Sequence, residues 1–120
     1  MTRSAKFSRL LSEYTEDKRF KLLEPLRYRA STGRVVVPAG FVTDMDSVPR
    51  LPVAYAMFKG RAVKAAVVHD YLYSIQAGKS YADTVFLEAM KDEGVAWYLR
   101  YPIHWAVVVG GHLSYNKYSK

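Results

Sequence analysis

The chain contains no cysteine in its 120 residues. This absence excludes a disulfide framework, a thiolate metal site and a cysteine nucleophile, and it is consistent with a reducing compartment. Long hydrophobic runs are also missing. The longest apolar segment, about residues 101–113, is interrupted by a proline, two histidines and two glycines, so it is too short and too polar to span a bilayer. We expect no transmembrane segment and, from the polar first residues, no signal peptide.

Acidic residues are few compared with basic ones: 11 Asp and Glu against 18 Lys and Arg give a net charge of +7. This balance is typical of a merely basic soluble domain or of a protein whose partner is acidic, such as nucleic acid, anionic lipid or an acidic protein surface. The basic residues form no dense block, and no zinc-finger or glycine-rich RNA-binding signature is present. Nucleic acid is therefore the least favoured partner; it would require binding with a steep salt dependence.

The length and the hydrophobic share of 50% predict a single domain over residues 1–120 with its own core. In the N-terminal third, a β-branched run at residues 35–37 and a turn signal at residues 31–33 predict a β-hairpin over about residues 18–38. The proline-punctuated residues 39–60 predict a loop of the kind that carries functional groups.

From residue 61 to about 112, apolar residues recur at helical spacing. Gly78 predicts the break between two helices, and Ser80 predicts the N-cap of the second helix, with Asp83 as its capping-box acid. Because a short connection joins these two helices, we expect them to pack antiparallel.

A third helix is expected from about Ala96 to Gly110, with a kink or break at Tyr101–Pro102. The polar tail over residues 113–120 is expected to fray. The fold class predicted is therefore α+β: a small N-terminal β-hairpin or sheet, followed by an antiparallel helical hairpin and a C-terminal helix.

The groups that carry chemistry centre on His69. Histidine acts as a general base when a neighbouring carboxylate fixes its tautomer. Tyr73 lies one helical turn further on the same face, and Asp83 on the next helix can reach His69 across the hairpin. Asp70 points about 100° away from His69, at the edge of any pocket, where it could bind a cation. The candidates are thus His69, Asp83 and Tyr73 for catalysis and Asp70 for a metal ion.

Each candidate also has a purely structural interpretation. A histidine on an apolar helix face is more often a hydrogen-bonded core residue, an acid near a helix start stabilises that helix, and a tyrosine such as Tyr73 packs in cores. His104 and His112 share a helix face, but zinc needs a third ligand that this spacing does not supply.

Three motifs together resemble one family. They are G-F-x-T-D-x-x-S-x-P-R at residues 40–50, H-D-x-x-Y at residues 69–73 and A-D-x-x-F at residues 82–86. The pattern, over about residues 18–112, resembles a phage- and prophage-encoded domain family of unknown function. This resemblance implies a bacteriophage protein that is associated with the virion or tail or interacts with the host. Its partners would be other phage structural proteins or a host protein, in the virion or the host cytoplasm.

A second resemblance, over about residues 66–90, is to the core of viral and bacterial phospholipase A2. It implies that His69 activates a water, Asp83 orients His69 and Asp70 binds calcium, with a lipid ester of the host envelope as substrate. The calcium loop of that family has two closely spaced glycines, whereas this chain offers Gly40 alone. Asp44 or Asp46 would then supply oxygen ligands.

Two hypotheses of function therefore stand. In the first, which the incomplete calcium loop favours, the protein is a non-catalytic phage protein. His69, Asp70, Asp83 and Asp44 then form a buried polar network that fixes the fold. In the second, it is a calcium-dependent phospholipase A2-like hydrolase whose basic surface suits anionic lipid.

Overall fold

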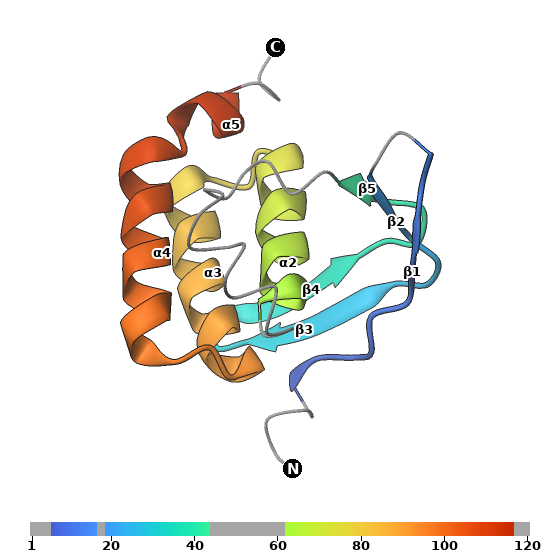
Figure 1. Cartoon of the computed structure of the whole chain (residues 1–120), viewed down its shortest axis with the longest axis horizontal. Coiled ribbons are helices and arrows are strands. Elements are labelled where there is room, and N and C mark those ends of the chain that lie inside the picture. Colours follow the sequence, from blue (N-terminus) through green and yellow to red (C-terminus); the bar gives the residue numbers. More distant parts are fainter. Residues whose placement is uncertain (1–5, 17–18, 44–61, 117–120) are drawn as a thin grey trace.

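The computed structural model describes residues 6–16, 19–43 and 62–116. Most of the loop expected at residues 39–60, including Asp44 and Asp46, lies outside these ranges. Within them, short strands come first and helices follow (Figure 1), so the predicted α+β class is confirmed. The strands are β1 (Ser12–Tyr14), β2 (Phe20–Leu22), β3 (Leu26–Ala30), β4 (Gly33–Val37) and β5 (Val42–Thr43). The helices are α2 (Val63–Ser74), α3 (Lys79–Glu93), α4 (Trp97–Gly110) and α5 (His112–Asn116).

The strands form two antiparallel groups: β3 pairs with β4, and β2 lies between β1 and β5. The hairpin is therefore shorter than the predicted 18–38, because β2 belongs to the other group. Pro25 lies between β2 and β3, and a proline cannot donate a main-chain hydrogen bond to a ladder. Strands β1 and β5 were not predicted; each is too short to show an alternating pattern.

The β3–β4 hairpin supplies one side of the core. Leu26 and Tyr28 alternate with exposed arginines along β3, and Val35 and Val37 are buried on β4. The buried side chains face α2 and α3, which contact β4 and β3 respectively. At its tip, the hairpin is fixed to α3 because Glu88 accepts hydrogen bonds from the main-chain nitrogen and the hydroxyl of Ser31, at 2.8 and 2.9 Å.

The turn between α2 and α3 differs in detail from the prediction. Helix α2 already ends at Ser74, and Gln76 takes the left-handed conformation with φ of 55°. Gly78 is the N-cap of α3 rather than the end of α2, and its φ of 112° suits a residue without Cβ. Ser80 consequently lies inside the first turn of α3, and no side chain caps that helix end.

The start of α2 is capped from a distance. Glu93, the last residue of α3, accepts hydrogen bonds from the main-chain nitrogens of Lys64 and Ala65, at 2.9 and 2.8 Å. A carboxylate at this place satisfies two of the amides that a helix N-terminus leaves without intrahelical partners. The start of α2 and the end of α3 are thus joined by hydrogen bonds as well as by packing.

Helix α4 lies on the outer side of α3 (Figure 1) and buries only Ile103 and Val107. It continues through Pro102, so of the kink or break predicted there, the break is absent. Pro102 is exposed, and the carbonyl that loses its helical donor there belongs to the exposed Tyr98, where water can replace the donor. Part of the expected tail forms α5. No helix within the described ranges has the length and apolar character needed to cross a membrane.

Candidate functional site

A buried polar centre joins α2 to α3. Nε2 of His69, on α2, lies 2.8 Å from Oδ1 of Asp83, on α3. The hydroxyl of Tyr73, one turn after His69, donates to the same oxygen at 2.7 Å. The exposed fractions of His69, Tyr73 and Asp83 are 0%, 0% and 3%. The helical hairpin therefore brings together the three residues that the sequence proposed as catalytic.

Lys79 extends this centre to a third helix. Its Nζ donates to Oδ2 of Asp83 at 2.7 Å and to the main-chain oxygens of Val107 and Val108 at 2.9 and 3.1 Å. Those oxygens belong to the last turn of α4, where a cation also interacts favourably with the helix dipole. The sequence analysis missed Lys79, although its spacing of four residues before Asp83 is the spacing at which helical ion pairs form.

The protonation of the centre follows from these contacts. Burial lowers the pKa of His69 and its hydrogen bond with Asp83 opposes this only in part, so the imidazole stays neutral at neutral pH. Burial alone would raise the pKa of Asp83, but its three hydrogen-bond donors outweigh that and hold the pKa below its ordinary value. Asp83 is therefore ionised, and Nε2 of His69 carries the proton that it donates to Asp83.

The surroundings of the imidazole are aromatic. The ring centroids of Tyr73 and Phe86 lie 4.2 and 4.6 Å from that of His69. Chemically, a neutral histidine whose Nε2–H is held by a carboxylate has the tautomer that a general base needs. A base must also reach a substrate or a water, and the side chain of His69 has no solvent exposure.

Asp70 is buried, whereas the sequence placed it at the edge of a pocket. Its exposed fraction is 1%, because α2 is covered by α3 on one side and by strands β4 and β5 on another. Most side chains of α2 are therefore buried. Asp83 is likewise not the capping-box acid of α3, since its oxygens are bound by side chains. The described residues contain no group of three or more His, Cys, Asp or Glu that could hold a metal ion. Asp44, the second proposed metal ligand, lies outside them.

A cavity of about 450 Å³ opens beside Asp83, on the side of Lys79 and α4. It is lined by Lys79, Ser80, Asp83, Thr84, His104, Val108 and His112. His104, on α4, and His112, on α5, thus line one cavity, but Gly111 separates their helices, so they do not share the single helix face that their spacing suggested. Burial lowers the pKa of His104, which keeps it neutral. The cavity therefore reaches the polar centre at Asp83 and Lys79, and His69 is not among its lining residues.

The outward face of α4 is unusually aromatic for a surface. Trp97, Tyr98, Tyr101 and Trp105 have exposed fractions of 67, 61, 52 and 67%, and Val108 and Val109 continue the row at 41 and 54%. We call these six residues the aromatic face. Large exposed apolar patches on proteins mark interaction surfaces, and Trp and Tyr are enriched among the residues that dominate binding energy.

A family model matches this chain. No curated protein and no solved structure matches the chain significantly. A family model described as "Protein of unknown function (DUF1353)" matches residues 20–107. The match includes the β-hairpin, the whole of α2 and α3 and most of α4, and therefore both the polar centre and most of the aromatic face. Because it extends over well above half of the sequence, the chain belongs to the DUF1353 family.

Proposed function

We propose that this is a non-catalytic bacteriophage protein, associated with the virion or tail or binding a host protein, and that it binds its protein partner through the aromatic face. The observation that carries the proposal is the exposure of Trp97, Tyr98, Tyr101 and Trp105 on one helix. The motifs at residues 40–50, 69–73 and 82–86 support a phage origin through their resemblance to a phage-encoded family.

The polar centre has a structural role in this proposal. Helix α4 buries only Ile103 and Val107, so apolar packing alone attaches it weakly. Lys79 adds two hydrogen bonds to its last turn and is itself held by Asp83. A buried network whose members are all bonded rigidifies a fold. The network thus keeps α4 in place while its outer side chains remain available to a partner.

The test uses a photo-crosslinking amino acid at position 105, in cells that carry the phage or prophage encoding the protein. We expect crosslinks to one defined phage or host protein. The matched control is position 14, because Tyr14 is 62% exposed but lies on β1, away from α4. The same crosslinks from both positions, or none from position 105 during phage production, would contradict the proposal.

A second candidate is the calcium-dependent phospholipase A2-like hydrolase. The observation in its favour is the 2.8 Å contact of His69 with Asp83, which is joined by Tyr73 at 2.7 Å. This is the arrangement of base, orienting carboxylate and supporting donor that the hydrolase hypothesis requires. In it, Asp70 and Asp44 hold calcium, which would polarise the ester carbonyl.

Fatty-acid release from vesicles of anionic phospholipid, with calcium or with a chelator, separates the two candidates. The hydrolase predicts calcium-dependent release that disappears in His69→Gln while the variant remains folded. The non-catalytic proposal predicts no release above background from the wild type. It also predicts that His69→Gln lowers the melting temperature, because the substitution changes a fully buried side chain in contact with Asp83.

A further inference from the structure

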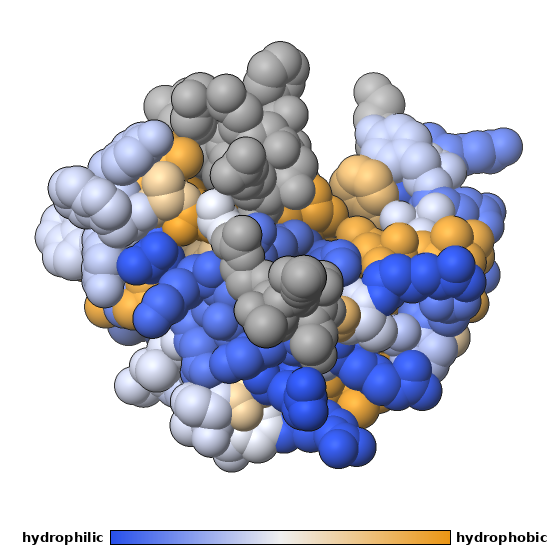
Figure 2. Space-filling view, turned by 90° about the horizontal axis from the view of Figure 1, so that it is seen from below, coloured by the Kyte–Doolittle hydropathy of each residue, from blue (hydrophilic) through white to orange (hydrophobic). Residues whose placement is uncertain are grey.

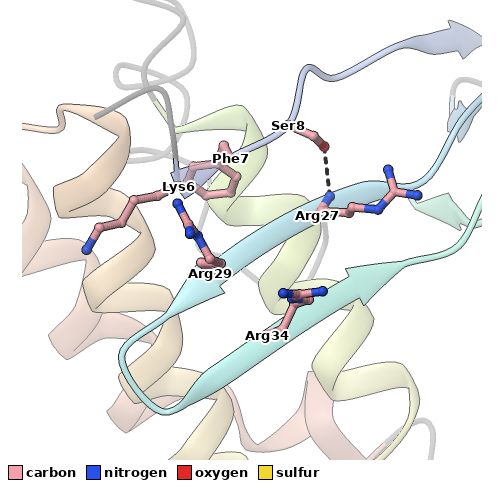
Figure 3. Close-up of a pocket in the computed structure, with 6 residues that line it drawn as sticks. All are labelled: Lys6, Phe7, Ser8, Arg27, Arg29 and Arg34. Carbon is pink, nitrogen blue, oxygen red and sulfur yellow. Dashed lines mark hydrogen bonds between the residues drawn. The ribbon is translucent and has the colours of Figure 1, made fainter. Parts of the chain in front are cut away.

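A second cavity, of about 310 Å³, lies on the opposite side of the hairpin from the helices. It is lined by Lys6, Phe7, Ser8, Arg27, Arg29 and Arg34. We call it the basic pocket. Figure 3 shows Arg27 and Arg29 on β3, Arg34 on the neighbouring β4, and the N-terminal segment with Lys6 running beside β3. Figure 2, which views the molecule from below, shows strongly hydrophilic residues across the middle of that side.

The wall of the pocket is fixed by specific contacts. The ring of Phe7 stacks on Tyr28 with centroids 4.3 Å apart, and the two residues form a β-bridge. Ser8 donates its main-chain N–H to the carbonyl of Arg27 at 2.9 Å, and its hydroxyl accepts from the Arg27 nitrogen at 2.8 Å. The segment that carries Lys6 is thereby attached to the strand that carries two of the arginines. A pocket held in this way needs little rearrangement to bind a ligand.

The lining of the pocket concentrates positive charge. Arg29 and Arg34 are direct partners in the β3–β4 register, and like charges at directly opposed positions destabilise a sheet. Lys6 and Arg27 add two further positive charges, and none of the described lining residues is acidic. Four cations around one hollow therefore indicate a site for a multiply charged anion.

We propose that the basic pocket binds a compact ligand that carries a pyrophosphate group. The planar guanidinium groups donate paired hydrogen bonds that match the oxygens of phosphate, and four positive charges balance the three to four negative charges of pyrophosphate. The volume of about 310 Å³ lies at the lower end of small-molecule sites, which run from about 300 to 1,000 Å³. A nucleic-acid strand is the poorer fit. Proteins that bind single strands use an extended groove with aromatic side chains on which bases stack. The aromatic residue of this pocket, Phe7, is only 8% exposed.

The test is calorimetric titration of the whole chain with inorganic pyrophosphate, and in parallel with a nucleoside diphosphate. We expect saturable binding of both. Equal affinities would identify the free pyrophosphate group as the recognised element. At least tenfold tighter binding of the nucleoside diphosphate would identify a nucleotide.

The variant Arg29→Gln/Arg34→Gln should bind about a hundredfold more weakly, at about tenfold for each lost charged donor. The control is Lys21→Gln/Lys91→Gln, which removes the same charge from exposed positions on β2 and α3 outside the pocket and should bind like the wild type. Both variants should keep a cooperative melting transition, because all four side chains are exposed.

Three outcomes would overturn the proposal. They are no saturable binding of either ligand, an equal loss of affinity in both variants, and binding of a single-stranded oligonucleotide that pyrophosphate does not compete away. The first would show that the pocket holds no such anion, the second that only net charge matters, and the third that the surface serves a polymer.

Discussion

Nε2 of His69 lies 2.8 Å from Oδ1 of Asp83 in the interior of the protein. This contact joins α2 to the beginning of α3, and the second oxygen of Asp83 continues through Lys79 to the end of α4. One ionised carboxylate therefore connects three helices. Its three donors are all side chains, so the consequences of changing it can be predicted from the loss of those bonds.

Replacing Asp83 with asparagine should lower the free energy of unfolding by about 2–4 kcal/mol, because the charged acceptor of three buried or half-buried donors is lost. Chemical denaturation measures this. The control is Glu24→Gln, which breaks the exposed Arg9–Glu24 pair at 2.9 Å and should stay close to the wild type, since exposed pairs contribute little. Similar losses in both variants would show that the burial of Asp83 has no special importance.

The same carboxylate predicts a response to acid. The pKa of Asp83 is held below its ordinary 3.8 in the folded protein, so its contribution to stability is present above that pH and is lost as the pH falls through the folded value. Wild-type stability should therefore drop more steeply than that of Asp83→Asn below about pH 4. If the stability of the wild type and of Asp83→Asn changes in parallel from pH 6 to pH 2, Asp83 has the same pKa in the folded and the unfolded protein.

Gly111 gives a steric prediction. A Cβ at this position would lie 2.7 Å from the hydroxyl of Tyr73, which donates to Asp83. We expect Gly111→Ala to destabilise the protein by about 1–3 kcal/mol, in the range of other overpacked sites. The neighbouring Gly110 is the matched control, because a Cβ there meets nothing within 4 Å. Gly110→Ala should be neutral or slightly stabilising, as expected for alanine in a helix. The melting temperatures of Gly111→Ala and Gly110→Ala test this prediction.

Glu93 predicts a pH dependence of opposite sign. Burial raises its pKa to about 7 from an ordinary value of 4.5, against the opposing effect of its hydrogen bonds from the amides of Ala65 and Lys64. The folded state therefore binds this proton more tightly than the unfolded state. Its contribution should fall by about 2–3 kcal/mol as the pH rises from 4.5 to 7 and stay constant above that.

The comparison for Glu93 is Glu93→Gln, which retains an oxygen acceptor for α2 and cannot titrate. The difference in stability between the wild type and this variant should change between pH 4.5 and pH 7 and level off above. A difference that is the same at every pH would mean that Glu93 titrates normally in the folded protein.

Much of the architecture follows from local patterns in the sequence. The turn signal at residues 31–33, the β-branched run at residues 35–37 and the helical spacing after residue 61 predicted the hairpin and the helices. The approach of His69 to Asp83 was predicted because two helices joined by a short turn pack antiparallel. Tyr73 followed from its spacing of four residues after His69 on the same helix face.

Other features depend on tertiary contacts that no local pattern encodes. Strands β1 and β5 consist of three and two residues, and only their pairing with β2 defines them. The burial of Asp70 follows from the coverage of α2 by strands as well as by α3. Glu93 caps a helix 28 residues earlier in the chain, a pairing that spacing cannot suggest. The basic pocket likewise required the fold, because it combines residues 6–8 with β3 and β4.

The central claim is that the polar centre holds α4 in place, and hydrogen exchange of the α4 amides in Lys79→Met tests it most directly. Methionine retains the apolar stem but removes the donor to Asp83, Val107 and Val108. We predict that amides in the second half of α4 exchange at least about tenfold faster, a loss of roughly 1.4 kcal/mol of protection. The slowest amides of the β3–β4 hairpin should change less, and Lys91→Met, at an exposed position of α3, should change neither. Unaltered exchange across α4 in Lys79→Met would contradict the claim.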